Sequence, residues 1–470
     1  MTEGDASPEG ADVPHAAASL RDLRAILALR RFRSLWLAGS LSSFGDWLAL
    51  LGTTSLAGEL AGGSVAQYLA VSGVFILRIA PAMVLGPLAG VVADRLDRRR
   101  TMISGDLLRF ALFATIPLVG TLWWMYLAIL LSECVSLFWN PAKDATVPNL
   151  VPPERLELAN QLGLIASYGT APVAALLFST LSVVSEPMHA IIPGLDPSGV
   201  YLAIYLNALT FLASAMVVSR LRFPPRAHLR SLAAESVVRT IKDGLIFIRK
   251  RPFVGGLIGG MLGAFAGGGL VIGLAQGFVK DVGAGAPGYG LLFVSVFTGM
   301  AAGLVLGPRA LTGLSRARLF GAAIIGAGIS LLVLAVVPVF AVAMPLAAVL
   351  GAFVGIAWVV GYTLLGLEVE DEVRGRTFAL VQTFDGVVLV LALAVGPLLA
   401  AALETVLSMP WVAHVGGLPL KYTGATATFL IAGCAMTATG ILAWRRMDDK
   451  PGLSLLAEFR EVRQRRRRRP

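Results

Sequence analysis

Charge is scarce in this sequence. Only 14% of its 470 residues are Asp, Glu, Lys or Arg, against about 25% in soluble domains. A chain of this length with so few charged residues would not be soluble in water. A soluble enzyme and a disordered chain are therefore both excluded. Apolar residues are abundant instead: 56% of the chain is hydrophobic and the mean hydropathy is +0.77. These values predict a polytopic membrane protein.

Cysteine and histidine are scarce as well. The two cysteines, Cys134 and Cys434, lie in long apolar runs, so no disulfide framework is expected and both are interpreted as small apolar fillers. The four histidines are scattered without metal-ligand spacing. The phosphate-binding pattern G-x-x-x-x-G-K-[ST] is also missing, which leaves ATP-driven transport unsupported. We therefore expect no metal, no cofactor and no enzymatic activity.

The apolar residues are gathered in twelve continuous runs. Each is long enough to cross about 30 Å of hydrocarbon as a helix, and none shows the alternation of a barrel strand. The sequence thus predicts an all-α fold with twelve transmembrane helices. The runs are 34–57, 66–92, 102–121, 122–142, 160–184, 200–219, 253–279, 287–307, 319–337, 339–363, 377–403 and 422–444.

The basic residues lie almost entirely on one side of these runs. All but four of the 39 Lys and Arg residues fall in the termini or in every second connection. The exceptions are Lys280 and Lys421 in the opposite connections and Arg78 and Arg109 inside runs. Because basic connections stay in the cytoplasm, both termini are predicted to be cytoplasmic, in the plasma or inner membrane.

The chain divides at its longest interior polar stretch. Residues 220–252 separate two sets of six runs, and 235–249 within them read as an amphipathic surface helix. The sequence VLGP occurs late in the second run and again late in the eighth, which indicates two pseudo-symmetric halves. The predicted domains are a disordered tail over 1–30, a six-helix half over 31–219, a central loop over 220–252, a second half over 253–444 and a basic tail over 445–470. We expect the tail arginines to face anionic lipid, not nucleic acid.

A charged segment, GVVADRLDRRR, follows the second run. Its glycine permits a close approach, and its first acid can pair with an arginine or cap a neighbouring helix, which would latch the two halves on the inner side. The plainer alternative is a set of positive-inside arginines with one incidental acid. The inner-gate candidates are Gly90, Asp94, Arg95, Arg98 and Arg99.

This segment resembles the loop signature of the major facilitator superfamily, G-x-x-x-D-R-x-G-R-R, except that Asp97 stands where glycine is usual. Residues 30–50, 140–161 and 372–382 are similar to the bacterial branch that includes siderophore and macrolide exporters. The stretch WRRMDDKPGLSLL also resembles the junction before a thymidylate kinase domain in actinobacterial fusions, although no such domain follows. The resemblance implies alternating access between two halves.

Three charged residues lie near the middle of predicted spans. Asp46, Arg78 and Glu133 occupy the first, second and fourth runs, and an ionisable group at that depth is costly unless it has a function. One acid would pair with Arg78, and the other would bind a proton or a cationic group of the substrate. A static ion pair that orients the helices is the alternative. The resemblance implies that the first and fourth helices line a central cavity.

Other candidates are less deeply placed. Asp106 and Arg109 are spaced to pair on one helix face, either structurally or as part of an inner gate. Asp385 is a candidate to meet Arg109 or a residue of the charged segment. Trp358 and Tyr362 contact substrate or belong to an aromatic belt. Gly267 to Gly269 indicate either a broken helix or close helix packing.

We therefore expect a secondary transporter that exports a small amphipathic or drug-like molecule in exchange for protons. The alternative is a transporter-like membrane anchor or scaffold for a cytosolic partner, suggested by the fusion-like junction and the basic tail.

Overall fold

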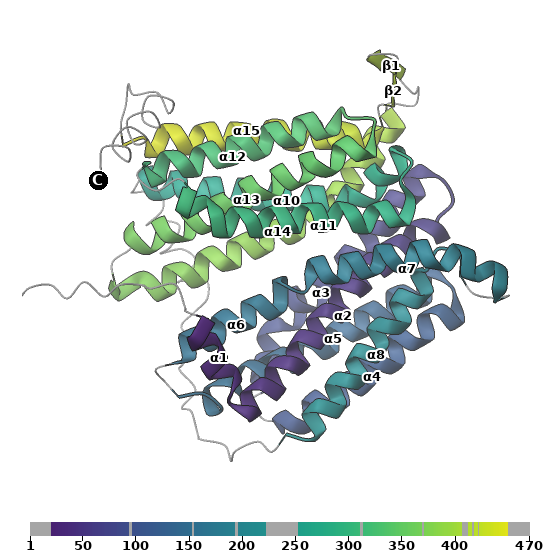
Figure 1. The fold of residues 1–470 in the computed structure, drawn as a ribbon, viewed down its shortest axis with the longest axis vertical. Helices are drawn as coiled ribbons and strands as arrows, with labels where there is room; N and C mark the ends of the chain where they lie inside the picture. Colours follow the sequence, from purple (N-terminus) through teal and green to yellow (C-terminus); the bar gives the residue numbers. More distant parts are fainter. Residues whose placement is uncertain are drawn as a thin grey trace, which may run out of the picture.

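The computed structural model consists of two helical bundles that lie against each other (Figure 1). The structure describes residues 20–93, 96–152, 155–192, 196–221, 252–310, 314–368, 371–406, 412–415, 418–421 and 423–449. The predicted surface helix at 235–249, the basic tail beyond 450 and the first 19 residues lie outside this part of the chain.

The first bundle begins with a short helix and continues with long ones. Its elements are α1 (Leu20–Leu27), α2 (Arg30–Leu60), α3 (Ser64–Ala93), α4 (Arg98–Val119), α5 (Leu122–Asp144), the 3-10 helix η1 (Val147–Asn149), α6 (Leu156–Tyr168), α7 (Ala171–Ile191) and α8 (Val200–Ser219).

The second bundle ends with a small hairpin before its last helix. Its elements are α10 (Pro252–Asp281), α11 (Gly285–Ala310), α12 (Arg316–Ala335), α13 (Phe340–Glu368), α14 (Asp371–Val406), β1 (Val412–Val415), β2 (Leu418–Lys421) and α15 (Gly424–Met447). The strands are antiparallel, with Val412 opposite Lys421.

The two bundles repeat the same helix packing. In the first, α2 packs on α8, α4 on α5 and α8, and α3 on α5; in the second, α10 packs on α15, α12 on α13 and α15, and α11 on α13. The bundles meet where α3 packs on α14 and α7 on α11, which are equivalent pairs. The architecture is therefore two pseudo-symmetric halves, as the sequence predicts.

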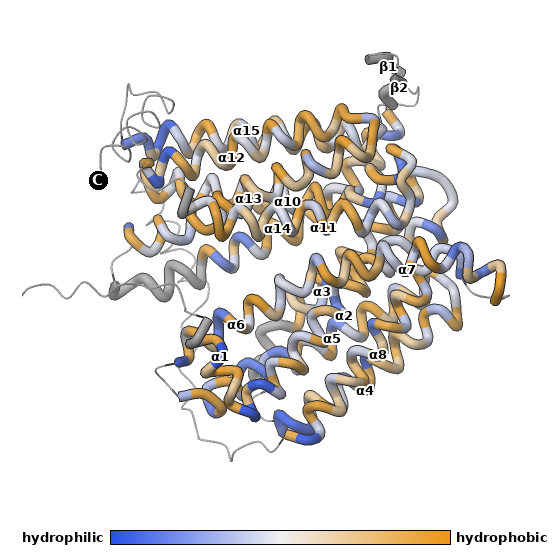
Figure 2. Tube along the Cα trace, viewed as in Figure 1, coloured by the Kyte–Doolittle hydropathy of each residue, from blue (hydrophilic) through white to orange (hydrophobic). Residues whose placement is uncertain are grey.

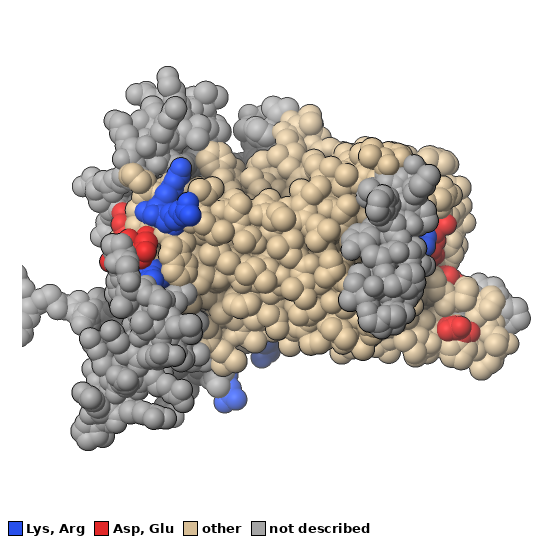
Figure 3. Space-filling view, turned by 90° about the horizontal axis from the view of Figure 1, so that it is seen from above, with Lys and Arg blue, Asp and Glu red and all other residues tan. Residues whose placement is uncertain are grey.

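Apolar length gives eleven candidate membrane spans in the described part of the chain, with α6 and α7 counted as one. The remaining long helix, α2, has 31 residues and lies among them, but it is more polar and is not one of the eleven. Apolar residues run along the middle of the helices (Figure 2). The charged side chains visible in Figure 3 lie toward the two ends, with an uncharged surface between them. This distribution is that of a protein embedded in a bilayer.

Local sequence explains the helix boundaries nearest the site. The α4 helix starts at Asp97, whose side chain accepts a hydrogen bond from the Arg100 backbone N–H at 2.8 Å, and it ends at Gly120, which has a φ of 62°. Asp97 itself has a φ of −70°. The position that is usually glycine thus needs no left-handed backbone here, and an N-capping side chain serves it well.

The glycine triplet does not break its helix. The α10 helix is continuous, and a Cβ on Gly269 would come within 2.6 Å of the Leu389 carbonyl oxygen of α14. The triplet therefore permits close helix packing, and the expectation of a broken helix is wrong.

Four of the hydrogen bonds that join the halves lie toward the end away from α1. Two hold side chains together: Lys280 Nζ donates to Gln67 Oε1 at 2.6 Å, and the Thr54 and Tyr289 hydroxyls lie 3.0 Å apart. The others run from Ser72 to the Ala394 carbonyl at 2.6 Å and from Gln276 to the Ser55 carbonyl at 3.3 Å. Toward α1 the helices of the two halves splay apart (Figure 1).

Candidate functional site

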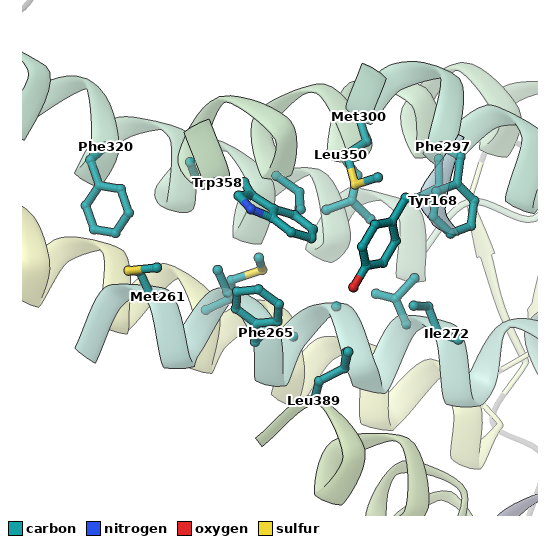
Figure 4. Close-up of a pocket in the computed structure, with 18 of the residues that line it drawn as sticks. Tyr168, Met261, Phe265, Ile272, Phe297, Met300, Phe320, Leu350, Trp358 and Leu389 are labelled. Carbon is teal, nitrogen blue, oxygen red and sulfur yellow. The ribbon is translucent and has the colours of Figure 1, made fainter. Parts of the chain in front are cut away.

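An apolar cavity of about 150 Å³ lies in the C-terminal half, against the N-terminal half. Its walls come mainly from α10, α11 and α13, and two residues of the other half, Trp47 of α2 and Tyr168 of α6, complete it. Figure 4 shows Tyr168, Phe265 and Trp358 with their rings turned toward one space, and methionines beside them. Aromatic and thioether side chains suit an apolar group of variable shape.

The aromatic walls are held by contacts across the halves. The Trp358 ring lies 5.8 Å from that of Tyr168 and 5.4 Å from that of Phe265, and Trp47 meets Phe297 edge-on at 5.1 Å. Trp47 is further fixed because its indole N–H donates to the Ser167 carbonyl at 2.7 Å. The cavity therefore depends on how the two halves approach each other.

Charged groups gather in the other half. Arg78 Nη1 lies 3.7 Å from Glu133 Oε1, and these side chains are 17% and 27% exposed. Asp46 is exposed and has no hydrogen bond or ion pair within the described chain, but it lies within electrostatic range of Arg78 and Arg109. The structure thus brings Asp46, Arg78 and Glu133 together from three helices and pairs Arg78 with Glu133.

Asp106 and Arg109 form a second, deeper pair inside the N-terminal half. Arg109 Nη2 donates to Asp106 Oδ1 at 2.6 Å, and both side chains are almost completely buried. Ser214 donates to the other Asp106 oxygen at 2.7 Å, and the guanidinium lies 4.2 Å above the Phe211 ring. Every one of these partners belongs to the same half. The arrangement fits the structural interpretation of the pair better than the gate.

The candidates in the C-terminal half meet each other. The Tyr362 hydroxyl donates to Asp385 Oδ2 at 3.1 Å, and Asp385 is 2% exposed. Neither residue lines the cavity, whereas Trp358 does. Asp385 therefore sits in a polar contact between α13 and α14, and within the described residues it makes no hydrogen bond or ion pair with Arg109.

The charged segment after α3 is described only in part. Asp94 and Arg95 lie outside the described residues, and of Gly90 only the helical backbone is described. Arg98 donates to the Ala145 carbonyl at 2.8 Å and Arg99 donates to the Ser219 carbonyl. Both arginines thus bind helix ends of their own half, and a latch to the other half stays a prediction.

Sequence reasoning missed several cavity residues. Trp47, Tyr168 and Phe265 line the cavity but carry no motif. The available signals were slight: Trp47 directly follows the mid-span Asp46, and Tyr168 precedes the Gly169–Thr170 turn that separates α6 from α7. Among the described residues no group of three or more His, Cys, Asp or Glu side chains could hold a metal ion.

Two six-helix halves with a cavity between them are the architecture of a large class of membrane transporters. Residues 24–452 match the family model described as transmembrane secretion effector. The chain belongs to this family of the major facilitator superfamily and is a multi-pass membrane transporter, not an enzyme.

Similar proteins agree with this class. The chain is 25% identical to the uncharacterized MFS-type transporter YfiS of Bacillus subtilis, over 86% of this chain and 90% of that protein. It is 31% identical to the putative bacilysin exporter BacE of Bacillus subtilis and 25% identical to macrolide efflux protein A of Streptococcus pyogenes. Those two matches cover 40% and 37% of this chain and 44% and 41% of the relatives, so the chain aligns with less than half of each named exporter.

Solved structures show the same fold at low sequence identity. A D-xylose–proton symporter matches with a TM-score of 0.64 and 16% identity, over 90% of this chain and 99% of that one. A bacterial homologue of the lysosomal transporter Spinster, inward-facing and unoccupied, matches with a TM-score of 0.61 and 13% identity, over 91% and 96%.

Proposed function

We propose that this protein exports a small amphipathic molecule and that proton uptake drives the export. The observation that carries the proposal is a pair of unlike surfaces, one in each half. An apolar aromatic cavity lies in one half, and partly exposed charges lie in the other. A substrate with an apolar body and a polar or basic group matches both.

The charged group supplies the chemistry of coupling. Glu133 faces Arg78, whereas Asp46 forms no ion pair with any described residue. An exposed charge facing lipid at mid-membrane depth would be costly, so we assign the exposed surface of Asp46 to the space between the halves. From there Asp46 can exchange a proton for a cationic group of the substrate.

The basic residues support one orientation in the membrane, and the arrangement of the halves supports export as the direction of transport. The basic residues are concentrated in the termini and alternate connections, which favours a cytoplasmic location for both termini. The halves are joined by hydrogen bonds at the opposite end and splay apart near α1 (Figure 1). In this orientation the splayed ends of the helices face the cytoplasm, the side from which a substrate for export is loaded. The partial similarity to proteins named as macrolide and bacilysin exporters points the same way.

Proteoliposome transport tests the proposal directly. With a radiolabelled macrolide as probe and an imposed pH gradient, we expect gradient-driven transport by the wild type. Asp46→Asn should lower that transport at least tenfold while leaving gradient-independent exchange of the probe. Ser43→Ala, a nearby change on α2 that leaves the charges alone, is the control. Gradient-driven transport that survives in both Asp46→Asn and Glu133→Gln would overturn the coupling assignment. A wild type that moves no member of a panel of amphipathic probes but retains a cytosolic protein would favour the scaffold alternative.

A further inference from the structure

A second cavity, of about 500 Å³, lies on the side of the N-terminal half between the start of α4 and the middle of α5. It is separate from the central cavity and shares none of its lining residues. Leu107 and Leu108 of α4 are 45% and 49% exposed, so this part of α4 faces out of the bundle, toward the bilayer.

The groove changes from charged to apolar along its length. Asp97 and Arg100 lie in its first turn, Thr101 and Ser104 follow, and Leu108 with Phe138 of α5 form its apolar end. The α4 residues recur three or four positions apart, which places them on one helix face. The floor of the groove is the close contact of α4 with α5 at Gly105, where a Cβ would lie 3.1 Å from Val135 Cγ1.

The three consecutive arginines at the start of α4 have different partners. Arg98 donates to the Ala145 carbonyl and Arg99 to the Ser219 carbonyl, so both are used inside the protein. The Arg100 side chain lines the groove and is exposed. Within the described part of the chain, its guanidinium makes no ion pair or hydrogen bond.

The repeat shows what the same position does when it has a protein partner. The α12 helix is the counterpart of α4, and its N-cap Ser315 accepts from the Arg318 N–H as Asp97 does from that of Arg100. Arg318 is 3% exposed, and its Nε lies 3.3 Å from Asp448, the C-cap of α15. The C-cap of α8, the counterpart of α15, is Arg220, a like charge that cannot pair with Arg100.

We propose that this groove binds a membrane phospholipid whose headgroup carries a hydrogen-bond donor. The phosphate faces Arg100 with Thr101 and Ser104 beside it, because guanidinium and hydroxyl groups donate to phosphate oxygens. The ammonium or hydroxyl donor of the headgroup faces the Asp97 carboxylate. An acyl chain lies along Leu108 and Phe138. The order of these groups, charged at the helix start and apolar toward the membrane interior, matches the order of groups in a lipid leaflet.

Native mass spectrometry of the full chain tests this assignment. The protein is released from nanodiscs of phosphatidylethanolamine, phosphatidylglycerol or phosphatidylcholine, and the retained lipid adducts are counted. The first two headgroups have N–H or O–H donors and the third has none. We expect at least threefold greater retention of the first two. Asp97→Asn, which keeps a capping side chain, should abolish this preference. Arg100→Gln, which removes the partner of the phosphate, and Ser104→Phe, which fills the groove, should lower retention of every lipid.

Arg316→Gln is the matched control, because Arg316 is also an exposed arginine in the first turn of the equivalent helix. It should retain lipid as the wild type does, and an equal loss in both arginine variants would overturn the site. Equal retention of phosphatidylcholine would overturn the role of Asp97. Saturable binding of glycerol phosphate, without acyl chains, would overturn the lipid in favour of a plain anion site. Unchanged gel-filtration profiles keep loss of folding from imitating loss of binding.

Discussion

The two halves repeat one packing scheme but carry opposite chemistry where they meet. The middle of the N-terminal half holds Asp46, Arg78 and Glu133, with the Asp106–Arg109 pair behind them. The corresponding depth of the C-terminal half holds the aromatic and methionine walls of the cavity. The same helix packing thus occurs in both halves, but the side chains differ. In the proposed function, the first half carries the charged groups, and the second half holds the apolar body of a substrate.

The largest expected effect is a loss of stability when one of the two buried arginines, Arg109 or Arg318, is replaced. Arg109→Leu leaves Asp106 without its cation in a fully buried place, which should destabilise the protein by about 3–5 kcal/mol. Arg318→Leu should cost less, because its partner Asp448 is 22% exposed and can be hydrated. Thermal unfolding in detergent measures both. Equal losses, or a larger loss for Arg318→Leu, would contradict a charged core specific to the first half.

The next largest effect is a loss of gradient-driven transport, which we expect for the acid of the first half, Glu133, and not for that of the second, Asp385. Glu133→Gln removes the partner of Arg78 and should lower gradient-driven transport at least tenfold. Asp385→Asn keeps the shape of the Tyr362 contact and should change it less than threefold. Proteoliposome assays at matched protein density give both values. A larger loss for Asp385→Asn would move the proton-coupling role to the second half.

The cavity gives a moderate effect on affinity. Trp358→Ala removes a wall that contacts both Tyr168 and Phe265, and we expect the half-saturating macrolide concentration to rise about tenfold, which corresponds to about 1.4 kcal/mol. Trp123, which is 63% exposed at the start of α5, provides the control: Trp123→Ala should leave this concentration unchanged. Equal behaviour of the two variants would remove the cavity from substrate binding.

The smallest expected effect tests the polar contact of the second half. Tyr362→Phe removes one hydrogen bond to Asp385 and should cost about 1 kcal/mol of stability, with transport nearly unchanged. Thermal unfolding and the transport assay read the two quantities separately. A tenfold loss of transport would show that this contact belongs to the transport machinery.

Long-range patterns in the sequence predicted more than single residues did. Twelve apolar runs predicted the helices and their two halves, because burial in lipid imposes a length and an apolar composition on every span. The mid-span charges predicted which residues to examine, and three of them do lie together. The cavity was not predictable from Tyr168 or Phe265, because an aromatic residue in an apolar helix has the same local sequence whether it faces lipid, a neighbouring helix or a cavity. The prediction of a broken helix at the glycine triplet was wrong for a related reason, because only the position of α14 shows what the triplet packs against.

The polarity of α2 has a consequence for how the protein is made. This helix precedes the eleven spans that apolar length selects, and it carries Asp46 and several hydroxyl side chains. It packs on α3, α7 and α8, which are synthesised after it. A nascent chain ending soon after α2 would therefore hold a poor membrane anchor, and stable insertion of the first span depends on later helices that shield its polar face. We therefore expect the N-terminal half to assemble against the order of its sequence, with α2 held stably only after α3, α7 and α8 have formed.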